Sequence, residues 1–280
     1  MDSLTTSATE ISRAEALSRR YGAALPTDGP WNETIASLLD HRSVRSFLPD
    51  ALPPGTLETL IAAAQSAATS SNMQWWSAVA VTDPAKKKVL AEIAGGQKHI
   101  EQCPLFIAWI ADMSRNQRIS NATKTPFETM PWLETFMVAS IDAALAAQNA
   151  VVAAESMGLR TVYIGAMRND PGRVAELLGL PPQTVVVFGL CVGYATEKGA
   201  GEVKPRLPQA VVLHTERYDA SKEEALRAAY DVEMSKFSAR HELQAATWTQ
   251  RVLNRLGPIK AMNGRETLRA ALAKMGFEIR

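Results

Sequence analysis

The sequence predicts an α+β fold in which helices cover a buried sheet. Four segments of strand length contain almost only apolar residues, as strands covered on both faces do. These segments are residues 76–82, 105–111, 161–165 and 184–193. An alanine-rich segment at 136–157 has the length and composition of a long helix. The predicted helices and strands do not alternate regularly, which favours α+β over a doubly wound parallel sheet.

Several shorter helices are predicted around these segments. Apolar residues with helical spacing predict a helix that ends near Asp40. A second helix is predicted from Leu57 to Ala64, where apolar residues recur at i, i+3, i+4 and i+7 after a Pro-Pro-Gly turn. A short helix is expected at about 173–178, between the third and fourth strands. The residues from Ser221 onward are charged and predicted to be helical.

The long helix at 136–157 is apolar nearly all round. Its strongly polar residues are Asp142, Gln148, Asn149 and Glu155. A helix of this kind is buried on more than one side. In a chain of this size, we expect it to be enclosed by its own domain and by a second subunit.

The composition excludes several classes of protein. The chain has 280 residues, and 30 Lys and Arg residues against 29 Asp and Glu residues leave a formal net charge of +1. Such a chain has no overall field to attract nucleic acid or anionic lipid, so we expect neither partner. The charged first thirty residues do not resemble a signal peptide, and the long uncharged stretches contain too many polar, Gly and Pro residues to span a bilayer. We therefore expect a cytoplasmic protein.

The sequence lacks the common catalytic and metal-binding motifs. It contains no GxGxxG after a strand, no P-loop, no GxSxG and no HExxH. The four histidines (His41, His99, His214 and His241) lie far apart in the sequence, and no metal-ligand motif surrounds them. The two cysteines lie in apolar runs and are expected to be buried. A zinc enzyme or a serine hydrolase is not predicted.

Basic residues gather in two segments. Residues 41–47 (HRSVRSF) place two guanidiniums, an imidazole and a hydroxyl within five residues, a set that can bind a phosphate dianion. A solvated basic turn explains this segment equally well. In residues 204–208 (KPRLP), two prolines fix the backbone from which two cations project.

Two other polar segments contain glycine. Residues 95–99 (GGQKH) can be a helix C-cap and nothing more. Residues 163–169 (YIGAMRN) form the end of a strand that stops at Gly165. A glycine there lets a flat ring approach main-chain N–H groups closely, although a strand-ending turn is the commoner explanation.

Seven segments, in order, resemble the flavin-dependent nitroreductase family, and within it the bacterial oxygen-insensitive NADPH nitroreductase and flavin reductase group. The resemblance spans residues 31 to about 255 and covers the segments HRSVRSF, ATSSNMQWWS, AGGQKHI, AAQNAVVAAESMGL, VYIGAMRN, FGLCVG and VKPRLP. The resemblance implies a mixed sheet of four to five strands surrounded by helices, in an intertwined homodimer with FMN at the interface. It also implies one FMN-binding domain at 31–280, including a C-terminal helical excursion, after an N-terminal extension at 1–30.

The resemblance further implies which residues bind the cofactor. Those at the FMN phosphate are His41, Arg42, Ser43, Lys204 and Arg206. Those at the ribityl chain and the pyrimidine edge are Thr69, Ser70, Ser71 and Gln97, with Arg45 beside N1 and O2 of the ring. Those along the ring are Tyr163, Ile164, Gly165 and Ala166.

Substrate and NADPH are implied to meet Asn72, Arg168 and Arg240, the last as partner of the 2′-phosphate. The segment after Arg240 lacks the further arginines often found in this group, so fewer cations would pair with that phosphate. Since the flavin carries the chemistry, we expect no catalytic side chain and no metal.

The predicted function is that of an FMN-dependent NAD(P)H oxidoreductase. By a ping-pong mechanism, hydride would pass from NADPH through FMN N5 to nitroaromatics, quinones or free flavin. An alternative keeps the fold for a reductive dehalogenase or another specialised flavin enzyme, with residues 112–135 as a polar, mobile cover. A third hypothesis is a phosphate-binding module without redox activity.

Overall fold

The computed structural model describes residues 12–22 and 29–280. The rest of the predicted extension at 1–30 lies outside the described residues. The chain divides into two compact units. The sheet unit comprises Arg42–Gly201 and Met262–Arg280, and the helical unit comprises Met1–His41 and Glu202–Ala261.

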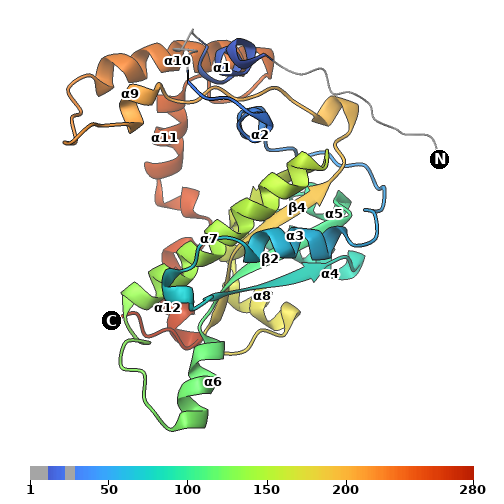
Figure 1. Ribbon diagram of the computed structural model, residues 1–280, viewed down its shortest axis with the longest axis vertical. Coiled ribbons are helices and arrows are strands. Elements are labelled where there is room, and N and C mark those ends of the chain that lie inside the picture. The colour runs from blue at the N-terminus through green and yellow to red at the C-terminus, as the bar shows by residue number, and fades with distance from the viewer. Residues whose placement is uncertain (1–11, 23–28) are drawn as a thin grey trace. The chain divides into compact units, whose positions relative to one another are not determined.

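The sheet unit contains four antiparallel strands (Figure 1). They are β1 (Trp76–Val81), β2 (Leu105–Asp112), β3 (Arg160–Ile164) and β4 (Thr184–Gly193), in the order β1-β2-β4-β3. Isolated bridges from Ser43 to Thr161 (parallel) and from Phe47 to Ala195 (antiparallel) place residues 43–47 beside the β3 edge. The predicted α+β class is confirmed, and each predicted strand matches an observed one to within one residue.

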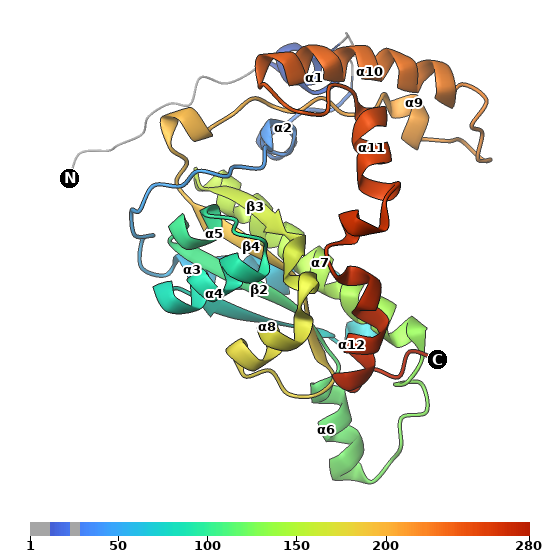
Figure 2. The ribbon, with the colours of Figure 1, turned by 180° about the vertical axis from the view of Figure 1, so that it is seen from behind.

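Helices cover both faces of this sheet. The helices of this unit are α3 (Thr56–Gln65), α4 (Pro84–Ile93), α5 (His99–Gln102), α6 (Ser114–Thr123), α7 (Leu133–Ser156), α8 (Pro171–Leu178) and α12 (Leu268–Lys274), of which α6 projects beyond the end of the sheet. Short 3₁₀ helices lie at η1 (Ser70–Asn72), η2 (Gly165–Asn169), η3 (Glu197–Gly199) and η5 (Arg265–Thr267). Figure 1 shows α7 and α3 on one face of the sheet, and Figure 2 shows α4, α5 and α8 on the other.

Strand β2 is buried at every one of its eight residues. Its alternate residues serve opposite faces of the sheet, because side chains along a strand point in turn to each side. Leu105, Ile107 and Trp109 pack in a cluster with α3 and α7. Phe106, Ala108 and Ile110 pack in a cluster with α4 and α8. The continuous apolar run in the sequence therefore reflects a strand with both faces covered.

Helix α7 begins three residues earlier than predicted, at Leu133, soon after Pro131. Alanines line its buried face, where the small side chains let the helix lie close to the sheet. Among the described residues, α7 is the one helix long and apolar enough to cross a membrane, a test that core helices also pass. Residues 112–135, expected to be a polar cover, contain the helix α6 and bury Met130 in the core.

The helical unit contains its own small core. Its helices are α1 (Arg13–Tyr21), α2 (Glu33–Asp40), α9 (Gln209–Val212), α10 (Glu223–Arg240) and α11 (Trp248–Leu256), and η4 (Ile259–Met262) follows them. Tyr230, Met234 and Phe237 of α10 are buried together, with Leu207 and Trp248 packed against them.

A bulge and a glycine shape the centre of the sheet. Trp109 of β2 pairs with Phe188, but Ile110 pairs with Val186, so Val187 of β4 is an extra residue without a partner in the register. Two residues along, Gly189 leaves room for the ring of Phe106. A Cβ on Gly189 would lie 2.1 Å from Cζ of that ring, which is closer than two carbons can approach.

Replacing Gly189 with alanine should therefore destabilise the fold. The added methyl group meets the fully buried Phe106, and overpacking of this kind costs about 1–3 kcal/mol. The measurement is the free energy of unfolding in urea. Gly172→Ala is the matched control, because its nearest neighbour would lie 3.8 Å from the new Cβ. A Gly189→Ala protein as stable as the wild type would contradict the close approach.

Candidate functional site

Residues 43–48 run as a segment beside the sheet that buries some side chains and exposes others. Val44 and Phe47 are buried in the core of the sheet unit, whereas Ser43 and Arg45 are exposed. The main chain is fixed by bonds from Val44 N to the Thr161 carbonyl (3.0 Å) and from Leu48 N to the Tyr194 carbonyl (2.9 Å). The segment therefore presents the predicted phosphate and ring residues outward.

The predicted serine-rich loop is fastened by one carboxylate of α7. Asp142 is only 2% exposed. It accepts bonds from Thr69 Oγ1 (2.5 Å), Ser70 N (3.1 Å) and Trp75 N (3.3 Å). The hydroxyl of Thr69 also accepts the N–H of Gln74 at 2.9 Å. The Thr69 hydroxyl is thus engaged inside the loop.

The same loop holds three non-glycine residues in the left-handed region. Ser71, Asn72 and Gln74 have φ angles of 50°, 55° and 53°. This backbone region is uncommon for such residues, and it persists where the surrounding structure fixes it. The bonds to Asp142 supply that constraint, and Ser70, Ser71 and Asn72 remain exposed.

Residues 95–99 close the C-terminus of α4 and lead to a buried histidine. Gly95 and Gly96 both have φ of +79°, and Gly96 N donates to the Ala91 carbonyl at 2.8 Å. Gln97 Nε2 donates to the Ala94 carbonyl at 3.0 Å. His99 is 8% exposed, and its Nε2 has no hydrogen-bond partner among the described residues.

His99 is linked electrostatically to Arg45. Burial lowers the pKa of His99, and the positive charge of Arg45 lowers it further. The imidazole is therefore held neutral. Arg45 supplies the positive charge at this position.

The turn after β3 is packed beneath an arginine. Gly165 opens η2, and a Cβ there would lie 3.3 Å from the Arg168 guanidinium. Arg168 donates through Nη1 to the carbonyl of Val187, the bulged residue of β4. Ile164 and Ala166, on either side of Gly165, are buried.

The side chain of Tyr163 is positioned by its contacts. Its ring lies edge-on to Phe188, with ring centres 5.1 Å apart. Its hydroxyl donates to Gln148 Oε1 at 3.4 Å. Burial raises the pKa of Tyr163 well above its ordinary value, so the phenol stays protonated.

The remaining predicted phosphate residues divide between the units. In the sheet unit, Arg42 Nε donates to the Ala200 carbonyl at 2.7 Å. In the helical unit, Lys204 Nζ lies 5.9 Å from the ring centre of Phe237, and Arg206 is exposed. The segments that carry His41 and Lys204 meet there, because Arg20 contacts a main-chain carbonyl of each.

Arg240 is already paired in the helical unit. Its Nη2 and Nε donate to one oxygen of Glu202 at 3.0 and 3.2 Å. The hydrogen bond from Arg240 is the main cause of a lowered pKa at Glu202. Both side chains are about half exposed.

Sequence reasoning missed three residues of this arrangement. The sequence identifies Asp142 only as a polar break in the long helix, although a carboxylate among alanines is a signal of a buried contact. Arg20 resembles its neighbour Arg19 in sequence, and nothing distinguishes the buried arginine from the exposed one before folding. No sequence pattern around Glu202 indicates that it pairs with Arg240.

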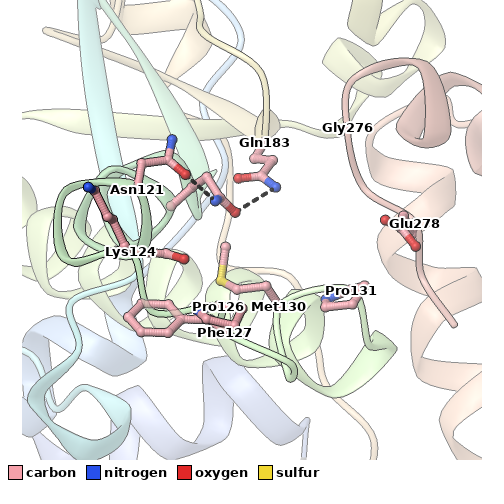
Figure 3. A pocket seen from close by; sticks show the side chains of 11 residues that line it. Asn121, Lys124, Pro126, Phe127, Met130, Pro131, Gln183, Gly276 and Glu278 are labelled. Atoms are coloured by element: carbon pink, nitrogen blue, oxygen red, sulfur yellow. Dashed lines mark hydrogen bonds between the residues drawn. The ribbon is translucent and has the colours of Figure 1, made fainter.

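Two cavities of the sheet unit lie apart from most of the predicted residues. One of about 460 Å³ is bordered by α6, by residues 126–131 and by Gln183, and includes no predicted site residue (Figure 3). Another of about 410 Å³ lies beside the serine-rich loop and is lined by Thr69, Met73, Gln74 and Arg115, among others. Within the described residues, no three His, Cys, Asp or Glu side chains gather as a metal site.

Comparison with known proteins decides the family. The sequence pattern of the Nitroreductase family matches residues 38–194, and that of the Nitroreductase family C-terminal domain matches residues 204–280. The chain belongs to the nitroreductase family. The resemblance inferred from the seven segments is therefore confirmed.

Named relatives of this nitroreductase family protein are flavin and nitro reductases. The FMN reductase (NADPH) of Bacillus subtilis is 38% identical over 80% of this chain and 91% of its own length. The NADPH-flavin oxidoreductase of Vibrio harveyi is 37% identical over 80% of this chain and 91% of its own length. The oxygen-insensitive NADPH nitroreductase of Salmonella typhimurium is 37% identical over 73% of this chain and 82% of its own length.

Solved structures agree in fold. NfrA2 of B. megaterium superposes with a TM-score of 0.83 at 38% identity, covering 89% of this chain and all of that one. The NADPH:FMN oxidoreductase of Vibrio harveyi, solved in complex with NAD+, gives 0.78 at 34% identity, with 89% and 100% coverage.

Proposed function

We propose that this protein is an FMN-dependent NAD(P)H oxidoreductase that reduces nitroaromatics, quinones or free flavin. The observation that carries the proposal is its 37–38% identity, over most of the chain, to relatives named as NADPH-dependent flavin and nitro reductases. The names of these relatives are those of reductases and not of dehalogenases, so the alternative chemistry is not favoured.

The residues present fit FMN. A phosphate dianion needs several cations and hydroxyl groups, and His41, Arg42, Ser43, Lys204 and Arg206 supply them. Arg206 and Ser43 are exposed, and Arg42 and Lys204 are half-buried. When bound, FMN supplies reversible two-electron hydride chemistry.

Other residues would orient the ring and tune it. Arg45 is exposed beside a neutral His99, so a single positive charge would stand at the pyrimidine edge of the flavin and would stabilise negative charge there. The serine-rich loop offers the hydroxyls of Ser70 and Ser71, while Thr69 remains a predicted contact whose hydroxyl also bonds Asp142. Gln97 and the chain from Tyr163 to Ala166 complete the predicted set.

Substrate and nucleotide are assigned to three further residues. Asn72 is exposed on the serine-rich loop, and Arg168 is half-buried over Gly165. Arg240 is assigned to the 2′-phosphate of NADPH. No side chain is needed as acid, base or nucleophile, because the cofactor carries the hydride.

A homodimer is supported by the outer face of α7. Leu133, Met137, Ile141 and Leu145 recur every four residues and are all exposed. Such an apolar stripe favours a partner surface. It explains why the helix is apolar all round, with one side on the sheet and the other available to a second copy of the chain.

The proposal extends to partners and location. The substrates are small molecules, and the net charge of +1 gives no overall attraction to nucleic acid or lipid. We place the protein in the cytoplasm, where reduced nucleotides are available to it.

The function is tested by the colour of the protein. We expect purified protein to bind FMN, to show a flavin absorption band, and to lose that band when NADPH is added without oxygen. A nitroaromatic should then restore the band, and iodotyrosine should not. A colourless protein that does not bind added FMN would refute the proposal.

The assignment of Arg45 is tested by FMN affinity. Arg45→Ala should weaken FMN binding about tenfold, as loss of a charge-assisted contact does. The control is Arg173→Ala, which removes a surface arginine paired with Glu92.

Nucleotide preference should depend on the Arg240–Glu202 pair. Because the guanidinium of Arg240 is hydrogen-bonded to Glu202, Glu202→Gln should weaken this pair and lower KM for NADPH by about threefold. Arg240→Ala should raise KM for NADPH by a similar factor or more. KM for NADH should stay nearly constant in both. Lys236→Ala, on the same helix and paired with Glu233, is the control. Equal changes for NADPH and NADH would exclude contact with the 2′-phosphate.

The dimer is tested by a charge on the stripe. Ile141→Glu should shift the mass in sedimentation equilibrium from twice 30.4 kDa toward 30.4 kDa, because a carboxylate would be buried without a partner. Ile141→Val keeps the apolar surface and should remain dimeric. A wild-type protein that sediments as a monomer would contradict the dimer.

A further inference from the structure

Arg20 lies in α1, ahead of both segments matched by the family patterns. Two arginines stand side by side near the end of this helix. Arg19 is about half exposed and pairs with Glu15 across one turn. Arg20 is 5% exposed and points into the helical unit. A buried guanidinium needs hydrogen-bond acceptors, so its contacts define its role.

Arg20 binds two segments that are far apart in the sequence. Its Nη2 donates to the carbonyls of Leu39 (2.6 Å) and His41 (2.7 Å), at the end of α2. Its Nη1 donates to the carbonyl of Lys204 at 2.9 Å. Its own carbonyl accepts the N–H of Arg206 at 2.9 Å. One residue thus contacts the main chain of three residues assigned to the FMN phosphate.

The contacts meet local needs of both segments. The last carbonyls of a helix lack intrahelical partners and carry partial negative charge, which a cation stabilises. Helix α2 has no basic residue in its own last turn, and Arg20 supplies that charge from α1. In the other segment, the Lys204 carbonyl precedes Pro205, whose own carbonyl accepts the Tyr230 hydroxyl at 2.8 Å. The carbonyls of Lys204 and Pro205 therefore accept hydrogen bonds from two different helices, α1 and α10.

We infer that Arg20 is a positioning residue for the phosphate end of FMN. It fixes the main chain of His41, Lys204 and Arg206, so that their side chains start from defined positions before the phosphate arrives. Pre-organisation of this kind raises affinity because less ordering remains to be done on binding. The inference rests on the proposed function, since it assigns a role at the same cofactor site.

A positioning role at the phosphate differs from a general structural role in one measurable respect. Riboflavin has the ring and ribityl chain of FMN but lacks the phosphate. Loss of Arg20 should therefore weaken binding of FMN and leave binding of riboflavin nearly unchanged. Loss of overall packing would weaken both flavins alike.

The experiment compares three variants of the full chain after removal of bound flavin. Arg20→Met keeps the length of the side chain without its donors, Arg20→Lys keeps the charge with fewer directed donors, and Arg19→Met is the exposed neighbour on the same helix. Dissociation constants for FMN and riboflavin come from quenching of flavin fluorescence, and thermal unfolding of the flavin-free proteins is recorded alongside.

We expect Arg20→Met to bind FMN about tenfold more weakly, with less than a twofold change for riboflavin. Arg20→Lys should lie between Arg20→Met and the wild type, and Arg19→Met should match the wild type. Unchanged FMN binding in Arg20→Met, or equal loss for both flavins, would overturn the inference. If Arg20→Met does not fold, Arg20→Lys decides by the same comparison. A wild-type protein that binds neither flavin would refute the proposed function instead.

Discussion

Strand β2 is buried along its entire length, and the arrangement of the sheet unit follows from this burial. With α3 and α7 on one face and α4 and α8 on the other, the described helices leave none of this strand for a ligand. Polar groups that bind small molecules must therefore lie where strands end or beside the edge of the sheet. The segment 43–48, the serine-rich loop and the turn at Gly165 all occupy such places.

The rigid core also fixes these loops through a few buried polar contacts. Asp142 projects from the central helix and holds the serine-rich loop in a backbone conformation that its residues rarely adopt alone. The bulge at Val187 frees a carbonyl that holds Arg168 over the turn after β3. In both cases a core element supplies the acceptor and the loop supplies the donor. The predicted site is thus built on positions set by packing.

The strands could be predicted because burial on both faces leaves its mark on every residue. The run from Leu105 to Ala111 is apolar throughout, and so is most of β4. The long helix was equally clear, since its alanines and apolar stripe reflect two packed sides. Single hydrogen bonds and ion pairs between distant residues leave no pattern in the sequence. The division between Arg19 and Arg20, the bond from Asp142 to Thr69 and the pair of Glu202 with Arg240 depend on residues brought together only by the tertiary fold.

Charge in this protein is organised locally, which the net value of +1 conceals. Some cations are bound within the fold: Arg240 by Glu202, and Arg20 by three main-chain carbonyls. Others are left facing outward, as Arg45 is beside an uncharged His99. A buried arginine that donates to main-chain carbonyls keeps its full positive charge while it orders the chain around it. In the proposed site, the cation that orders the main chain and the cations that would meet the ligand are therefore different residues, and each can be changed without removing the other.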